Sequence, residues 1–222
     1  MQDLIKQEQF ELEVLERLNS GQFLKQLVFG GGTMLRLCFG LNRFSVDLDF
    51  WRTQDFDTKR LFEGLKEYLT QFYSVKDSAD KFYTLLFEIK SKDYPRSLKI
   101  EIRKENRKIK TEQAIAYSPY ASSQVLLKVV SLNDMMKSKI DAFLERKEIR
   151  DVFDIEFLLK RGILLDVSRQ TLKGLLDEMA ALTKKDYSVK LGSLLEGDLR
   201  KYYTSENFKI LRQAIKERLG NV

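Results

Sequence analysis

Apolar residues recur with two different periods along this chain, and the period changes part-way through it. Where they recur every three or four residues they predict helices, and where they alternate with polar residues or gather with other strand formers they predict strands. The predicted helices cover 1–20, 33–39, 57–72, 132–145, 151–160, 167–181 and 205–219. The predicted strands cover 26–29, 46–51, 81–90, 98–103 and 125–130.

This order of elements predicts an α+β fold with two domains. Strands and helices mix over residues 1–131, where we expect a mixed sheet flanked by helices, and residues 132–222 read as almost entirely helical. No Ser/Gly-rich linker or low-complexity segment separates them, so we expect compact lobes. At the element boundaries, Gly40 is expected to end one helix and Asp57 to cap the start of another.

Composition removes several classes of enzyme. The 222 residues include no histidine and one cysteine, Cys38. A Ser-His-Asp triad, a Cys-His pair, a His-liganded zinc site and the ribonucleases that need a histidine acid or base are therefore excluded. A single cysteine cannot form an internal disulfide. Any catalysis must come from carboxylates, lysine, hydroxyl groups and hard cations.

The charge balance favours a polyanionic partner such as nucleic acid. The net charge is +6, and residues 99–110 alone carry six basic and two acidic side chains. Two further groups could contact nucleic acid, namely the basic residues Lys209, Arg212, Lys216 and Arg218 and the tyrosine pair Tyr202 and Tyr203. Solvated faces and packing tyrosines are the ordinary alternatives for these groups.

The sequence also carries no sign of a membrane or export segment. No apolar run reaches the ~20 residues that a membrane helix needs. The N-terminal residues MQDLIKQEQF lack the apolar stretch of a signal peptide. We therefore expect a soluble, cytoplasmic protein with no membrane partner.

Two aspartates share one face of a predicted strand. Because side chains alternate along a strand, Asp47 and Asp49 lie on one side, and Val46, Leu48 and Phe50 lie on the other. The carboxylates would be ~6.5–7 Å apart along the backbone, where their mutual repulsion favours a bound hard cation such as Mg²⁺. A solvated face of an edge strand is the alternative. Aspartate is a poor strand former, however, and two of them inside such a run favour a functional role.

A glycine-rich turn, Gly30-Gly31-Gly32-Thr33, lies between a predicted strand and a predicted helix. Glycines allow backbone N–H groups to approach a phosphate, and the helix N-terminus adds a positive dipole. The turn matches neither a P-loop nor a dinucleotide-binding fingerprint, and a tight strand-to-helix turn is the alternative. Together with the nearby aspartate pair, the turn predicts a site for a metal-bound nucleoside triphosphate (NTP).

These segments resemble the nucleotidyltransferase family of the AbiEii/AbiGii toxins, within the DNA polymerase β-like nucleotidyltransferase superfamily. The first matching block is G-G-T-x-L at residues 31–35, followed by R-F-S-x-D-x-D-F at residues 43–50. The second is Lys139 and a later R-D-x-x-D at residues 150–154. The resemblance implies a nucleotidyltransferase-like sheet followed by a helical lobe that completes the active-site cleft.

The resemblance also implies a role for individual residues. The residues expected to bind the nucleotide are Gly31, Gly32, Thr33, Arg43, Ser45 and Lys139. Asp47 and Asp49 would hold Mg²⁺ or Mn²⁺ and act in catalysis, and Lys139 and Asp154 would complete the site from the helical half.

A third carboxylate, Glu101, is expected from a neighbouring strand, as in the superfamily. Strand alternation puts Glu101 on the side opposite the apolar residues of its own segment. There it would ligate the metal and lower the pKa of the attacking hydroxyl. An exposed glutamate between the basic residues Lys99 and Arg103 is the alternative.

The helical block leaves alternatives open. Lys139 lies at the edge of the apolar face of its predicted helix, so it either contacts phosphates or reaches into solvent, and Lys137 competes with it. Asp151 could cap the next helix, whereas Asp154, one turn later, could pair with Lys139 or Arg150. Asp154 is therefore favoured for catalysis and Asp151 for structure.

The expected reaction is transfer of a nucleoside monophosphate from an NTP to an acceptor hydroxyl, with release of pyrophosphate. The resemblance implies that the acceptor can be the 3′ end of tRNA and that a cognate antitoxin accompanies the protein. Transfer to a small molecule or to a protein, and an inactive relative that binds RNA or a partner, are the alternatives.

Overall fold

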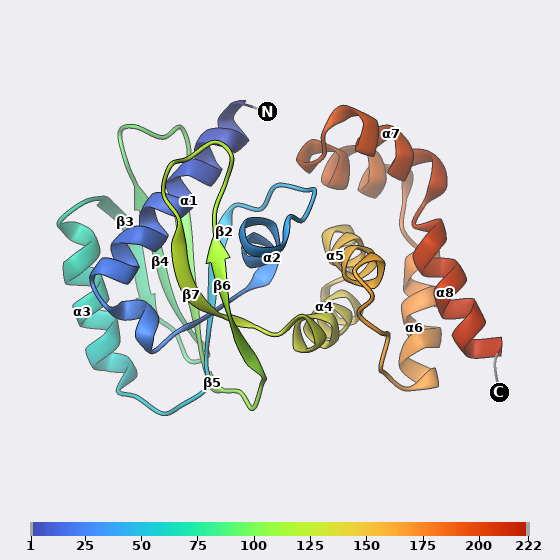
Figure 1. The fold of residues 1–222 in the computed structure, drawn as a ribbon, viewed down its shortest axis with the longest axis horizontal. Coiled ribbons are helices and arrows are strands. Elements are labelled where there is room, and N and C mark those ends of the chain that lie inside the picture. The colour runs from blue at the N-terminus through green and yellow to red at the C-terminus, as the bar shows by residue number, and fades with distance from the viewer. Residues whose placement is uncertain (1, 221–222) are drawn as a thin grey trace. The chain divides into compact units, whose positions relative to one another are not determined.

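Residues 2–220 are described by a computed structural model, in which two units follow each other along the chain (Figure 1). All strands of the described residues belong to the first unit, Met1–Ser131, and the second, Leu132–Val222, is helical. The expected α+β class is thereby confirmed. Within residues 2–220, no helix combines the length and the apolar character needed to cross a membrane.

The first unit is built on a mixed seven-stranded sheet. In spatial order the strands are β3-β4-β5-β2-β1-β7-β6, with β2 and β5 parallel, β1 and β7 parallel, and the other neighbours antiparallel. The strands are β1 (Val28–Gly30), β2 (Asp47–Arg52), β3 (Ser74–Asp80), β4 (Thr84–Lys90), β5 (Leu98–Asn106), β6 (Thr111–Ala116) and β7 (Val125–Val130). The helices are α1 (Gln2–Ser20), α2 (Gly31–Phe39), α3 (Thr58–Thr70) and the short 3₁₀ helix Phe23–Lys25.

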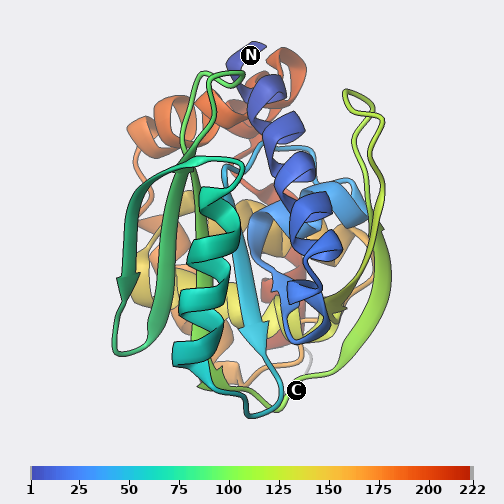
Figure 2. The ribbon, with the colours of Figure 1, turned by 90° about the vertical axis from the view of Figure 1, so that its left-hand side faces the viewer.

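One face of this sheet packs on helices and the other carries polar residues. Every second side chain of β4 and of the first half of β5 is buried, including Phe87 and Ile100. Figure 2 shows α1 and α3 lying in front of the strands, and the ring of Phe62 on α3 lies 5.1 Å from that of Phe87 between centroids. The intervening side chains of β2 and β5 point to the opposite face of the sheet, and they include Asp47, Asp49 and Glu101.

The sequence pattern did not predict strands β3 and β6. They form the two edges of the sheet, so each of them pairs with a single neighbour. Their sequences, SVKDSAD and TEQAIA, leave most side chains exposed or half-buried. Without a buried face, an edge strand needs no apolar alternation, and the sequence therefore gives no signal there.

The chemistry expected at two helix boundaries is confirmed. Gly40 ends α2 with a φ of 74°, and its N–H donates to the carbonyl of Arg36 at 3.1 Å. The carboxylate of Asp57 accepts hydrogen bonds from the amides of Lys59 and Arg60, both at 3.0 Å, and so caps α3. Each residue satisfies backbone groups that the helix itself leaves without a partner.

The second unit is formed by α4 (Leu132–Arg146), α5 (Ile149–Lys160), α6 (Arg169–Ala180), α7 (Gly197–Glu206) and α8 (Lys209–Gly220), with a π-helical turn at Asp186–Leu191 and a 3₁₀ turn at Gly192–Leu194.

The prediction of one helix over 205–219 is wrong. The chain turns between α7 and α8 because Asn207 and Phe208 adopt left-handed φ values of 48° and 58°. The break lets the Phe208 ring pack, fully buried, against Tyr187 and Tyr203.

Helix α1 buries three polar residues at its contact with the rest of the first unit. The Gln7 amide donates to the carbonyl of Ser97 at 3.3 Å, and Glu8 forms an ion pair with Arg36 of α2. Glu11 is fully buried, and neither of its carboxylate oxygens has a hydrogen-bond partner among the described residues. Burial raises the pKa of Glu11 well above its ordinary value, and the carboxylate of Glu8 raises it further. We therefore expect the folded chain to hold Glu11 protonated.

This burial predicts a pH dependence of stability. Glu11 binds its proton more tightly in the folded chain, so the unfolded chain loses that proton first, near the ordinary value of 4.5. The free energy of unfolding should therefore decrease as the pH rises above that value. Glu11→Gln, which is neutral at every pH, should remove this part of the decrease in urea unfolding curves recorded from pH 5 to 8. The exposed Glu63→Gln on α3 is the control. An unchanged decrease in Glu11→Gln would contradict a buried, neutral Glu11.

Candidate active site

The glycine-rich turn lies directly against the aspartate strand. Gly30 of β1 is the register partner of Asp49 of β2, and the next residue, Gly31, begins α2 with a φ of 76°. A Cβ atom on Gly31 would lie 2.9 Å from both Cβ and Cγ of Asp49, which real side chains do not tolerate. The glycine is therefore required by the close approach of Asp49 as well as by its left-handed backbone.

The next residues of the turn are held by the loop that leads into β2. A Cβ atom on Gly32 would lie 2.6 Å from Nη2 of Arg43 and 2.9 Å from Oγ of Ser45. The buried Thr33 donates its hydroxyl hydrogen to the carbonyl of Asp47 at 2.6 Å. Arg43 is itself buried and donates to the carbonyl of the next residue at 3.0 Å. The expected nucleotide-binding residues of the first unit thus form one connected group around the N-terminus of α2.

The sheet register brings a third carboxylate beside the aspartate pair. Strands β2 and β5 run parallel, with Asp49 opposite Glu101 and Asp47 opposite Lys99. Side chains that are paired across neighbouring strands point to the same face, so the three carboxylates share one face of the sheet. All three are half-buried, whereas Lys99 and Arg103 on the same face are exposed.

These carboxylates suit a hard divalent cation in kind, although they do not enclose one by themselves. Among residues 2–220, no three His, Cys, Asp or Glu side chains lie close enough together to hold a metal ion. Mg²⁺ commonly binds through one or two carboxylates, with water and substrate phosphates completing its octahedron. Asp47 and Asp49 therefore fit a cation that arrives together with a triphosphate, and do not fit a permanently held structural metal.

In the second unit, Lys139 is buried within a group of charged side chains. Only 7% of Lys139 is exposed, which excludes a lysine that reaches into solvent. Its Nζ lies 2.7 Å from Oδ2 of Asp154 and 3.4 Å from Oδ1 of Asp151, and both aspartates are fully buried. The packing of α4 on α5 thus places a lysine between two carboxylates. Lys137, the competing lysine, is exposed.

Asp151 does not cap helix α5, which was one of the roles left open for it. The helix begins at Ile149 and its N-cap is Glu148, so Asp151 lies inside the first turn. Both of its carboxylate oxygens accept hydrogen bonds from Arg146, at 2.6 and 2.7 Å. Arg146 belongs to this group but could not be selected from the sequence pattern, because a basic residue in the last turn of a helix is commonplace.

The second tyrosine of the predicted stacking pair is not available to a base. Tyr203 is 4% exposed, and its ring packs against Phe153 and Phe208 at centroid distances of 4.8 and 5.1 Å. Tyr202 is half-buried and meets Tyr203 edge-on. The alternative, that these tyrosines serve packing, is therefore correct for Tyr203.

A family model for the nucleotidyl transferase AbiEii toxin of type IV toxin–antitoxin systems matches residues 13–219. The chain belongs to the AbiEii family of nucleotidyltransferase toxins. The match extends well beyond the two sequence blocks and includes most of both units. Membership of the AbiEii family sets the enzyme class as nucleotidyltransferase.

Two solved structures resemble this chain over nearly its whole length. A candidate nucleotidyltransferase from H. pylori is 25% identical in sequence, with 96% of each chain covered and a TM-score of 0.61. JHP933 from Helicobacter pylori is 24% identical, with 96% of this chain and 93% of that chain covered and a TM-score of 0.59, and it shares the fold. No curated protein matches this chain in sequence.

Gly31 is needed both for its left-handed backbone and for the room that it leaves to Asp49. A second left-handed glycine allows these two requirements to be separated. Gly162 has a φ of 82° and no heavy atom within 4 Å of the position that a Cβ would take. Gly162→Ala should therefore lose only the backbone preference, about 1–2 kcal/mol of unfolding free energy. Gly31→Ala should lose clearly more, because its Cβ also displaces Asp49, and should lose nucleotidyl transfer as well. Urea unfolding of both variants measures the difference, and equal losses would contradict the close approach of Asp49.

The buried charges of the second unit predict a large effect of removing their lysine. Lys139→Met leaves two fully buried aspartates with one cation fewer, which should lower the free energy of unfolding by about 3 kcal/mol or more. Lys137→Met on the same helix removes an exposed charge and should change it by less than about 0.5 kcal/mol. Similar urea unfolding curves for the two variants would show that Lys139 does not compensate the buried carboxylates.

Proposed function

We propose that this AbiEii-family chain transfers a nucleoside monophosphate from an NTP to an RNA 3′ hydroxyl in a reaction that requires Mg²⁺ or Mn²⁺. The observation that carries the proposal is the approach of the Gly31 turn to Asp49, whose register partner on β5 is Glu101. A helix N-terminus suited to phosphate thus adjoins carboxylates suited to a divalent cation.

In this reaction a bond forms between the acceptor oxygen and the α-phosphorus of the NTP. The bond from that phosphorus to the bridging oxygen breaks, and pyrophosphate leaves. Asp47 and Asp49 would hold the cation, which when bound polarises the α-phosphate and offsets the charge of the leaving group. Glu101 would accept the proton of the acceptor hydroxyl, a role supported by its position opposite Asp49.

The remaining residues of the first unit would orient the triphosphate. The first amides of α2, from Gly31 to Thr33, lack helical partners of their own and can donate to phosphate oxygens. Arg43 and Ser45 lie against Gly32 and add a cation and a hydroxyl at the same turn. Reactions of this kind depend mainly on positioning and charge, which agrees with a chain that has no histidine.

Lys139 and Asp154 are proposed to act on the same substrate, as the family resemblance implies. Their own unit supports a defined role, because a buried lysine held by two aspartates is fixed in direction at a considerable desolvation penalty. A lysine so fixed contacts a phosphate as a point charge. Asp154, at 2.7 Å, would set the direction of its ammonium group.

The acceptor is proposed to be the 3′ end of tRNA, and the partner a cognate antitoxin. The AbiEii family is described as part of type IV toxin–antitoxin systems, which supports the antitoxin. The net charge of +6 and the basic run of residues 99–110 support a nucleic-acid acceptor. Cytoplasmic action follows from such an acceptor and is part of the same proposal.

The test follows two labels of the same nucleotide. The protein is incubated with Mg²⁺, total tRNA and each NTP labelled at either the α- or the γ-phosphate. Label from the α-phosphate should become attached to RNA, and label from the γ-phosphate should leave as pyrophosphate. Asp47→Asn should reduce the transfer roughly hundredfold, and chelation of the metal should abolish it until Mg²⁺ or Mn²⁺ is restored.

Two controls sharpen this test. Asp77→Asn removes an exposed carboxylate from β3 of the same sheet and should leave the transfer unchanged. A tRNA whose 3′ hydroxyl is blocked should accept no label. Transfer that survives Asp47→Asn would contradict the proposed site, and α-label found on protein or on a small molecule would contradict the proposed acceptor.

A further inference from the structure

Two large aromatic side chains lie exposed at the connection between β3 and β4. Phe82 is 84% exposed and Tyr83 is 75% exposed, and their rings meet edge-on with centroids 4.6 Å apart. Scattered single apolar residues are normal on a protein surface, whereas two adjacent rings at the tip of a hairpin form a small patch. We call Lys81, Phe82, Tyr83 and Arg103 together the aromatic tip.

The cations of the aromatic tip have no carboxylate partner among the described residues. Lys81 and Arg103 are both exposed, and neither forms an ion pair in residues 2–220. Arg103 is the register partner of Thr84, the residue after the rings. Lys104, by contrast, is paired with Asp80. The tip therefore combines two exposed cations that form no ion pair among residues 2–220 with two exposed aromatic rings.

The register of the sheet fixes how far the aromatic tip lies from the carboxylates. Glu101 of β5 is opposite Leu86 of β4, and Arg103, two residues further, is opposite Thr84. Tyr83 follows one position beyond, so the aromatic rings of the tip begin about 10 Å from Glu101 along the strands. This distance is comparable to about three nucleotides of a stacked strand. Arg103 and Glu101 share one face of β5, so a bound strand could follow that face.

We propose that the aromatic tip binds the single-stranded 3′ end of the acceptor RNA. Bases stack on Phe82 and Tyr83, and Lys81 and Arg103 contact the backbone phosphates. Exposed aromatics beside cations are the arrangement by which proteins hold single-stranded nucleic acid without reading its sequence. The inference rests on the proposed function and names the surface that would bring the RNA to the carboxylates.

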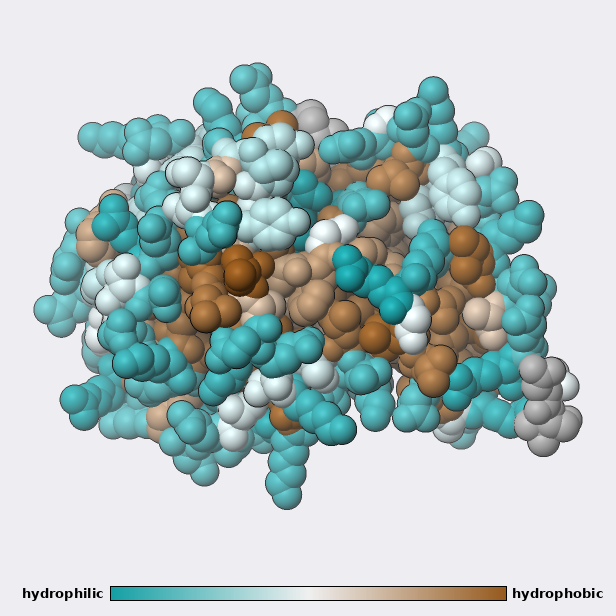
Figure 3. Space-filling model, in the orientation of Figure 1, coloured by the Kyte–Doolittle hydropathy of each residue, from teal (hydrophilic) through white to brown (hydrophobic). Residues whose placement is uncertain are grey.

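A second exposed apolar patch on the same unit lacks this combination. Ile115, Tyr117 and Leu126 lie on or beside β6 and β7 and are 50%, 54% and 62% exposed, and Figure 3 shows brown side chains over these strands. The cavity at this patch is lined by neutral residues, among them Cys38 and Gln113. The patch therefore provides a matched control for the loss of exposed apolar surface.

The first test measures the binding of a short single-stranded RNA with a free 3′ hydroxyl, by fluorescence anisotropy of the full chain. The double variant Phe82→Ala and Tyr83→Ala should weaken binding about tenfold or more. It should raise the KM for RNA by a similar factor and leave the KM for NTP unchanged. The control pair Ile115→Ala and Leu126→Ala should bind as the parent chain does, and Phe82→Tyr with Tyr83→Phe should keep the affinity.

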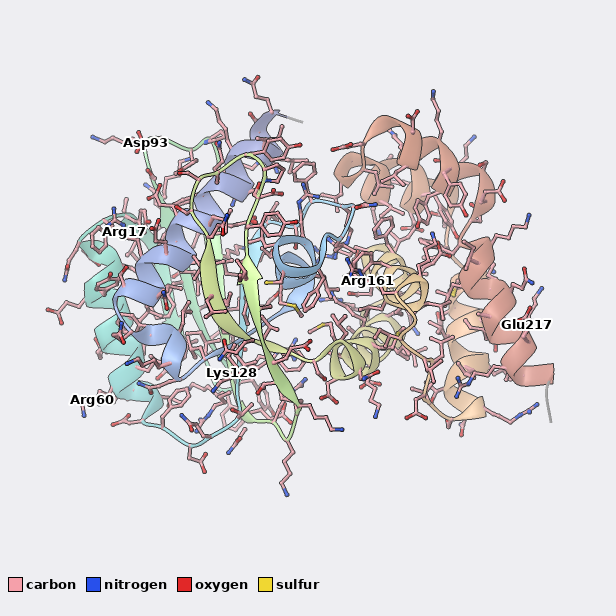
Figure 4. All side chains as sticks on the ribbon, in the orientation of Figure 1. Arg17, Arg60, Asp93, Lys128, Arg161 and Glu217 are labelled. Atoms are coloured by element: carbon pink, nitrogen blue, oxygen red, sulfur yellow. The ribbon has the colours of Figure 1, made fainter. Side chains whose placement is uncertain are left out.

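The second test measures how binding depends on salt. Arg103→Ala should weaken RNA binding and reduce the slope of log affinity against log salt by about one. Lys92→Ala removes one exposed positive charge from the loop at the other end of β4, and it should leave the slope unchanged. Figure 4 labels its neighbour Asp93 in that loop, above the strands in that view.

Failure of this inference and failure of the proposed function give different results. The aromatic tip is not the RNA surface if the parent chain labels RNA and two variants do so equally well. These are the double variant Phe82→Ala with Tyr83→Ala and the single variant Arg103→Ala, and both must also bind RNA as tightly as the parent chain. If RNA binding depends on the tip but no nucleotide is transferred, the inference stands and the proposed function fails. If the variants of the aromatic tip lose antitoxin binding while their RNA affinity is unchanged, the inference is overturned and the tip is a protein-docking surface.

Discussion

The close approach of the glycine turn to strand β2 is the constraint on which the rest of the candidate site depends. Gly31 has room for Asp49 only because it has no side chain, and Gly32 has room for Arg43 in the same way. Thr33 then ties the turn to the backbone of β2. One contact surface thus sets the position of the helix N-terminus and of the carboxylates together, and a shift of either would separate the proposed phosphate-binding turn from the proposed metal ligands.

Strand alternation was sufficient to predict which face of the sheet each side chain occupies, but not which strands are adjacent or which residues lie opposite each other. It put Asp47 and Asp49 on one side of β2 and Glu101 on the polar side of β5. Only the register shows that Asp49 and Glu101 are opposite each other, because β5 reaches β2 after two strands that lie further out in the sheet. The glycines likewise left a phosphate cradle and a tight turn as alternatives. The sequence could not show that Asp49 fills the space over Gly31.

The features that could not be predicted from the sequence depend on packing between residues that are distant along the chain. The edge strands β3 and β6 carry no apolar alternation, and without β3 the exposed pair Phe82 and Tyr83 could not be placed at a hairpin tip. The break before α8 lets Phe208 pack against two tyrosines, one of which, Tyr187, is distant in the sequence. Helical periodicity left Lys139 between solvent and cleft. Its burial depends on the carboxylates of α5, which lie 12 and 15 positions further along the chain.

The Asp49 face of the sheet is expected to bind a nucleotide and a divalent cation together. Calorimetry of each of the four NTPs, with and without Mg²⁺, tests this most directly. At least one NTP should bind to the parent chain only when Mg²⁺ is present, and Asp49→Asn should abolish the effect of the cation while Asp77→Asn preserves it. Equal NTP binding with and without Mg²⁺, or an unchanged Mg²⁺ dependence in Asp49→Asn, would contradict joint binding of nucleotide and cation at Asp49.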